Sequence, residues 1–126
     1  MNFENRPMPL LKIQTNYHEI PSSDLKTLQD EGAKILAEEI GKSLDFVMVL
    51  VEVGKSISFG GQAEQGTAFL EIKNVGSLAP ELTHSISVRL CALLEDSLNI
   101  SPDRCYLEFQ ESERHMWGWN GKTFGS

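Results

Sequence analysis

The chain has 126 residues, of which 40% are hydrophobic and 23% charged, so it has the length of one domain that can bury a core of its own. Its 11 basic and 18 acidic side chains give a formal net charge of −7, which argues against nucleic acid or an anionic membrane as a partner. Two cysteines are too few for a disulfide framework, no apolar run approaches the roughly 20 residues of a membrane span, and the N-terminus lacks the apolar stretch of a signal peptide. We therefore expect a cytoplasmic protein, with unconventional secretion left open.

The first periodic segments of the chain predict a strand followed by a helix. Residues 10–16 alternate partly between apolar and polar side chains, which is typical of a short strand. Leucine and isoleucine then recur at helical spacing over about 23–40. Ser22 and Ser23 are candidates for the N-cap of this helix, and Gly41 is a natural C-terminal stop.

The rest of the chain predicts three more strands and a second helix. Residues 46–53 are β-branched and almost continuously apolar, which favours a central strand that is buried on both faces. A further strand follows over 67–73, and a helix begins at Pro80 and presents leucines along one side as far as Leu98. The last regular strand covers 104–109, before an aromatic and glycine-rich tail.

The two halves of the chain repeat the pattern of strand, helix and strand. Ile13 corresponds to Ile72 and Met48 to Leu107 at the same shift of 59 residues. Two strands joined by a helical crossover lie parallel, so each half is a right-handed βαβ unit. The predicted fold class is α+β, with tandem βαβ units forming a four-stranded mixed sheet and both helices on one face. An apolar central strand needs cover on the other face too, which predicts a homo-oligomer.

Neither the cysteines nor the histidines indicate chemistry of their own. Cys91 and Cys105 lie in apolar surroundings of a helix and a strand, where we expect them to pack as small hydrophobic residues. His18, His84 and His115 have no spacing typical of metal ligands. We expect no metal and no other cofactor.

A set of small features becomes informative through its order on the doubled βαβ frame. The features are Met8-Pro9, Gly41-Lys42, Phe59-Gly60-Gly61, Val75-Gly76, the run Ile100-Ser101-Pro102-Asp103-Arg104 leading to Tyr106, and the tail Trp117-Gly118-Trp119-Asn120-Gly121. Together they resemble the macrophage migration inhibitory factor family of the tautomerase superfamily over residues 9–124. The Met-Pro-Leu opening and the aromatic tail look most like its microbial, cyanobacterial members.

The resemblance implies an isomerase that works as a homotrimer with sites between subunits. Its activity would be keto–enol tautomerisation of phenylpyruvate-type acids, with dopachrome as a further substrate. The base would be Pro9 as an N-terminal residue, and Lys42 and the backbone N–H of Val75 would bind the substrate carboxylate. Tyr106 would come from the neighbouring subunit. Taken singly, Lys42 reads as a solvated residue past a helix end and Tyr106 as a packing residue.

The resemblance also implies an apolar wall and shows one departure. The wall would hold a phenyl ring and consists of Leu10, Phe46, Trp117, Trp119 and Phe124. Where animal members of the family carry an asparagine that contacts the substrate, this chain has Glu108. A carboxylate there accepts a hydrogen bond from a phenol but repels a second substrate carboxylate, so the substrate preference stays open.

Residues 1–8 decide whether this chemistry is available. Behind Met8, the nitrogen of Pro9 is an amide without a basic lone pair, so such a chain is expected to be inactive. We expect these residues to be a leader or an artificial extension, with initiation at Met8 and removal of that methionine as the preferred explanation; cleavage and loss of the activity are the alternatives. The competing functions are a cytokine-like signalling or host-interaction protein with an unidentified receptor, and a catalytically silent trimer.

Overall fold

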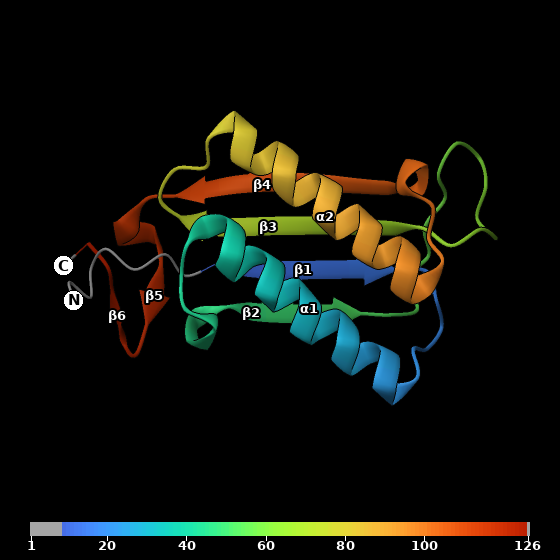
Figure 1. Ribbon diagram of the computed structural model, residues 1–126, viewed down its shortest axis with the longest axis horizontal. Coiled ribbons are helices and arrows are strands. Elements are labelled where there is room, and N and C mark those ends of the chain that lie inside the picture. Colours follow the sequence, from blue (N-terminus) through green and yellow to red (C-terminus); the bar gives the residue numbers. More distant parts are fainter. Residues whose placement is uncertain (1–8, 126) are drawn as a thin grey trace.

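The computed structural model describes residues 9–125, which form two helices over one face of a four-stranded sheet (Figure 1). The main elements are β1 (Leu10–Thr15), α1 (Ser22–Ile40), β2 (Met48–Glu52), β3 (Ala68–Val75), α2 (Pro80–Leu98) and β4 (Cys105–Ser112). Short 3-10 turns η2 (Leu44–Phe46), η3 (Pro102–Arg104) and η4 (Arg114–Met116) and the hairpin β5 (Gly118–Trp119) and β6 (Lys122–Thr123) complete them. The leader expected over residues 1–8 lies outside the described residues.

The sheet confirms the predicted tandem βαβ architecture. Its strand order is β2-β1-β3-β4, with β1 parallel to β2, β3 parallel to β4, and β1 antiparallel to β3. Leu10 pairs with Met48 in the first unit, and Phe69 pairs with Tyr106 in the second. Each helical crossover returns the chain to the end of the sheet where the unit began, so the two strands it joins run parallel.

The core lies between the helices and every second residue of the strands. Leu11 and Ile13 of β1 and Leu70 and Ile72 of β3 are fully buried beneath the helices. The helices contribute Leu28, Leu36, Ile86, Leu90 and Leu94, also fully buried. A Cβ on Gly32 would lie 2.9 Å from Cδ2 of Leu11, so glycine allows α1 to approach β1 closely.

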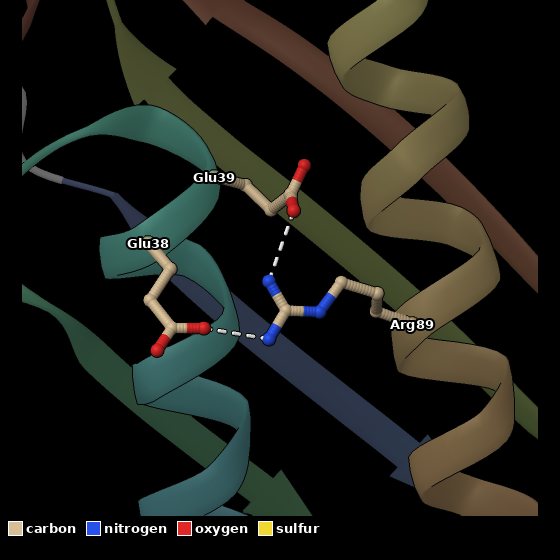
Figure 2. A network of polar contacts seen from close by, with 3 residues as sticks. All are labelled: Glu38, Glu39 and Arg89. Atoms are coloured by element: carbon tan, nitrogen blue, oxygen red, sulfur yellow. Dashed lines mark hydrogen bonds and ion pairs between the residues drawn. The ribbon is translucent and has the colours of Figure 1, made fainter.

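An ion-pair network joins the two helices on the outer surface of the helical layer (Figure 2). Arg89 of α2 lies between two carboxylates of α1, with Nη1 donating to Glu39 at 2.9 Å and Nη2 to Glu38 at 2.6 Å. The Ser85 hydroxyl, followed by the Arg89 guanidinium, lowers the pKa of Glu39 below its ordinary value of 4.5. The last turn of α1 is therefore tied to the middle of α2.

The helix ends agree with the sequence at Gly41 and Pro80 and differ at the start of α1. Gly41 ends α1 with φ 79°, and Pro80 occupies the first turn of α2. The prediction that Ser22 or Ser23 caps α1 is wrong, because both residues already lie inside the helix. Pro21 takes the cap position instead: its φ of −54° starts the helix, and its carbonyl accepts the Leu25 N–H at 2.9 Å.

The prediction of a central strand over 46–53 is also wrong. The strand is limited to β2, and it lies at the edge of the sheet, where it pairs with β1 alone. Phe46 belongs to η2, and only Val49 and Val51 of the strand pack against the core. Met48 is 66% exposed and Leu50 43%, so the apolar side chains on the other side of β2 are uncovered in the single chain.

The sheet face opposite the helices carries both charged and apolar groups. Lys12 lies between two carboxylates, with its Nζ 3.6 Å from Glu52 and 3.7 Å from Glu71. The exposed side chains of Met48 and Tyr106 lie on either side of this charged centre, on β2 and β4. Within residues 9–125, no helix is long and apolar enough to cross a membrane.

Candidate active site

The start of β1, the turn before β2 and the C-terminal hairpin meet at one end of the sheet (Figure 1). Pro9 is buried immediately before β1, and its carbonyl accepts the N–H of Met48 at 3.1 Å. A cavity of about 450 Å³ opens beside it. The lining residues are Pro9, Leu10, Asp45, Phe46, Val47, Met48, Trp117, Gly118 and Trp119. The cavity is thus mostly apolar and has Pro9 in its wall.

Aromatic rings from distant parts of the chain build one wall of this cavity. Phe46 meets Trp119 edge-on, with ring centroids 5.5 Å apart and planes at 84°. Trp119 stacks on Phe124 at 6.5 Å with planes at 6°. Phe124 is buried against Val75, so the wall continues into a small core of its own. Edge-to-face and stacked arrangements are those that aromatic rings prefer, so this wall offers a flat apolar surface.

The hairpin that carries the wall is encoded locally. Asn120 and Gly121 connect β5 and β6 with φ of 55° and 78°, the positive values that a two-residue hairpin turn requires. The N–H of Phe124 then bonds the carbonyls of Arg114 and Trp117, both at 3.2 Å. These contacts fold the tail back on η4 and place Trp119 at the cavity.

The proposed carboxylate-binding residues lie at the ends of neighbouring elements. Lys42 is exposed one residue after Gly41, and its N–H bonds the Ala37 carbonyl at 2.8 Å. It precedes η2, which supplies Phe46 to the lining, although Lys42 itself does not line the cavity. Val75 is the last residue of β3 and is buried against Phe124 rather than at the cavity surface.

Tyr106 and Glu108 lie far from Pro9 within one chain. Tyr106 pairs with Phe69 on β3, and Phe69 pairs with Gln14 at the opposite end of β1 from Pro9. Two strand spacings and five residues along a strand separate Tyr106 from Pro9 by roughly 15–20 Å. Tyr106 is 65% exposed and rests against Phe59, with ring centroids 4.9 Å apart.

The cavity also has lining residues that sequence reasoning did not name. Asp45, Val47 and Met48 lie in the same run as Phe46 and reach the lining through the turn η2. Asp45 is the one carboxylate among the described lining residues. A Ser-x-Asp run before an apolar strand is a signal for such a turn: the Ser43 hydroxyl accepts the Asp45 N–H at 3.1 Å.

A larger depression of about 930 Å³ lies at the ends of β3 and β4. It is lined by Gly76, Ser77, Glu111, Ser112, Glu113, Arg114, His115, Phe124 and Gly125. It is polar, wide open to solvent, and excludes Pro9 and the two tryptophans from its lining. The smaller apolar cavity is therefore the better candidate for a site that binds an aromatic acid.

The cysteines lie apart from the cavity. Cys105 is buried beneath α2, and burial, with the Cys91 thiol beside it, raises the pKa of Cys105 to about 12. Burial likewise raises the pKa of Cys91. Thiols held neutral are poor nucleophiles and metal ligands. Among residues 9–125, no group of three or more His, Cys, Asp or Glu is placed to hold a metal ion.

Comparison with known proteins identifies the class and then the family. The family model described as "Macrophage migration inhibitory factor (MIF)" matches residues 8–125. The chain is 34% identical over 119 residues to a macrophage migration inhibitory factor homolog of Brugia malayi, covering 94% of this chain and 100% of that protein. It is 30% identical over 119 residues to macrophage migration inhibitory factor of Rattus norvegicus, covering 93% and 99%.

Solved structures agree with the sequence relatives. The macrophage migration inhibitory factor homologue from Prochlorococcus marinus superposes with a TM-score of 0.84 at 34% identity, covering 92% of this chain and 99% of that one. The fold is that of the tautomerase superfamily. Within it, the chain belongs to the macrophage migration inhibitory factor family, which confirms the resemblance, including the likeness to a cyanobacterial member.

Proposed function

We propose that this protein is a keto–enol tautomerase of phenylpyruvate-type acids and that Pro9 is its base when it is the N-terminal residue. The observation that carries the proposal is the burial of Pro9 in the wall of an apolar cavity built from Phe46, Trp117 and Trp119. Family membership supports the reaction class. The family match begins at residue 8, directly before Pro9, which supports a working chain that starts there.

The proposed chemistry moves one proton within the substrate. The free secondary amine of Pro9 takes the proton of the enol hydroxyl, and the protonated amine returns a proton to the carbon next to the new carbonyl. The reverse direction begins with removal of that carbon-bound proton, so the amine is regenerated in both directions. An apolar wall disfavours the charged amine and lowers its pKa towards neutrality, which leaves the lone pair free at pH 7.

The remaining groups would hold the substrate. Lys42, at the end of α1, supplies the cation for the carboxylate, with the backbone N–H of Val75 as a second donor. Leu10, Phe46, Trp117 and Trp119 line the cavity and would receive the phenyl ring. Phe124 is not in this lining and would support the wall by stacking on Trp119. A cavity of about 450 Å³ lies within the range usual for small-molecule sites.

Tyr106 and Glu108 would complete the site from a neighbouring subunit of a homotrimer. Both side chains are exposed on β4 and lie too far from Pro9 to act within one chain. The uncovered Met48 and Leu50 at the opposite edge support a subunit contact on this sheet face. Glu108 then accepts a hydrogen bond from a phenolic substrate and disfavours one with a second carboxylate.

The test compares three forms of the protein with phenylpyruvate. Residues 9–125 contain every described element, so the chain that begins at Pro9 keeps the whole described fold. We expect activity from this chain and a loss of at least about 100-fold in Pro9→Gly and in the full chain. Pro80→Gly, at the first turn of α2, is the matched control and keeps the activity. Equal rates for Pro9→Gly and its parent would refute the assignment.

A further inference from the structure

Asn74 is a buried polar residue whose side-chain carbonyl lacks a partner. It is 2% exposed, and its Oδ1 makes no hydrogen bond to any of residues 9–125. Two of the other buried polar side chains are satisfied, since Thr15 donates to the Thr67 carbonyl and Arg104 donates to the Thr67 hydroxyl. The second buried atom without a hydrogen bond, Oε1 of Glu52, lies 3.6 Å from the Lys12 ammonium, whereas Oδ1 of Asn74 has no such ion pair. A buried carbonyl without a donor is unfavourable, so it calls for an explanation.

The sheet register places this carbonyl next to Pro9. Leu10 pairs with Lys73 in the antiparallel ladder of β1 and β3, so one further step puts Pro9 opposite Asn74. Pro9 lies two positions before the buried Leu11, and Asn74 lies two positions after the buried Ile72. Side chains two positions apart on a strand share a face, so both residues lie on the side of the sheet that faces the helices. Residues directly opposite each other on antiparallel strands have Cβ atoms about 5 Å apart, within reach of a carboxamide.

A free N-terminal proline can supply the missing donor, whereas a proline inside a chain cannot. A proline inside a chain has no N–H, so it offers nothing to the Asn74 carbonyl. A free N-terminal proline has one N–H and one lone pair when neutral and two N–H groups when protonated. We propose that Oδ1 of Asn74 accepts a hydrogen bond from the free Pro9 amine and thereby turns the amine lone pair towards the cavity. The proposal rests on the proposed function of Pro9 as base and makes Asn74 a positioning residue.

A neutral acceptor suits this task better than a charged one. The charged and titratable groups around this end of the sheet come from the connection between α1 and β2, from β3, β4 and β6, and from the turn η4. They are Lys42, Asp45, Lys73, Glu111, which accepts the Leu78 N–H, Glu113, Arg114, His115 and Lys122. A carboxylate at position 74 would add a second negative charge to that of Asp45 and keep the amine protonated. An amide oxygen orients the amine and still allows it to lose its proton.

The first experiment uses stability and needs no activity. The melting temperature is measured for Asn74→Leu in the full chain and in the chain that begins at Pro9. In the full chain we expect it to stay or to rise, because an unpartnered carbonyl is removed; in the shorter chain we expect it to fall, because a hydrogen bond is lost. Thr15→Val is the matched control and changes both backgrounds equally. Equal changes for Asn74→Leu in the two backgrounds would overturn the proposal.

The second experiment follows the pH dependence of kcat/KM in the chain that begins at Pro9. Asn74→Leu and the smaller Asn74→Ala remove an acceptor that favours the protonated amine, so the acid limb moves to lower pH by about half a unit to one unit. Asn74→Asp moves it to higher pH. An acid limb that stays in place in all three variants would contradict the role of Asn74. If the parent shows no activity, the proposed function fails, while the melting temperatures still decide the hydrogen bond.

Discussion

The guanidinium of Arg104 donates two hydrogen bonds to the hydroxyl oxygen of Thr67, from Nη2 at 2.6 Å and from Nε at 3.1 Å. It also donates to the carbonyls of Phe59 and Gln62, at 3.1 and 2.9 Å, and lies 5.4 Å from the centre of the Phe59 ring. Arg104 is 8% exposed and ends the Ser-Pro-Asp-Arg run. This arginine of the family motif therefore fastens the turn over 59–62 to the sheet and supports the ring on which Tyr106 rests.

Replacing Arg104 should destabilise the fold. In Arg104→Met the Thr67 hydroxyl loses its donor, and the carbonyls of Phe59 and Gln62 keep only the backbone N–H groups that they accept from each other. We expect this loss to lower the free energy of unfolding by about 2–4 kcal/mol. Arg104→Lys keeps the charge but cannot reproduce the planar fork, so it should recover only a small part of that loss. Urea denaturation of the three proteins measures both values. A change below about 0.5 kcal/mol in Arg104→Met would contradict the role of this network.

The ion-pair network between α1 and α2 should make a pH-dependent contribution to the stability of the fold. Since Ser85 and Arg89 lower the pKa of Glu39, their contribution to stability is present above pH 4.5 and is lost as the pH falls through the folded-state value. These side chains are partly exposed, so Arg89→Met should reduce stability at pH 7 by at most about 1 kcal/mol. Denaturation at pH 7 and pH 3 tests this. A loss that is as large at pH 3 as at pH 7 would show that packing, and not the ion pair, is responsible.

The positive charge of Lys42 should raise kcat/KM by binding the substrate carboxylate. A charge-assisted hydrogen bond to a carboxylate is worth about 10–100-fold in kcat/KM, so Lys42→Ala in the chain that begins at Pro9 should lose that factor. Lys34→Ala, which removes an exposed lysine of α1, the helix that precedes Lys42, is the matched control and should lose nothing. Steady-state kinetics with phenylpyruvate compares them. Equal kcat/KM values for the two variants would remove Lys42 from the site.

A site shared between subunits predicts complementation. Pro9→Gly and Tyr106→Ala should each be inactive alone, because every site then lacks one of its two contributors. After unfolding and joint refolding, about a quarter of the sites in a mixed trimer combine an intact Pro9 with an intact Tyr106. Activity should therefore return to about that fraction of the parent value. Mixing without recovery, in a sample shown by light scattering to be trimeric, would contradict a site that spans two chains.

The tandem βαβ frame was predictable because its signals are local. Helical spacing up to Gly41 and the proline at position 80 mark the helices, and a helical crossover leaves little choice of strand direction. The edge position of β2 was not predictable in the same way. An apolar run such as that around Met48 and Leu50 indicates that its side chains are buried in the working protein. It does not indicate whether the same chain or another one buries them.

The cavity residues were likewise predictable only in part from the sequence. Leu10, Phe46 and Trp119 were named through the order of motifs, and the structure brings them together around Pro9. Asp45 was missed because its role depends on a single 3-10 turn. Asn74 was missed because its position opposite Pro9 depends on the register between β1 and β3. That pairing joins distant parts of the chain and is not indicated by the sequence around either residue.

We propose that a free Pro9 amine makes this protein an enzyme. The most direct test of this proposal is the intact mass of protein purified from its native source, measured together with phenylpyruvate tautomerase activity on the same sample. We expect an active protein whose mass is that of the chain beginning at Pro9. An active protein with the mass of the complete 126-residue chain, or a protein that begins at Pro9 and is inactive, would contradict it.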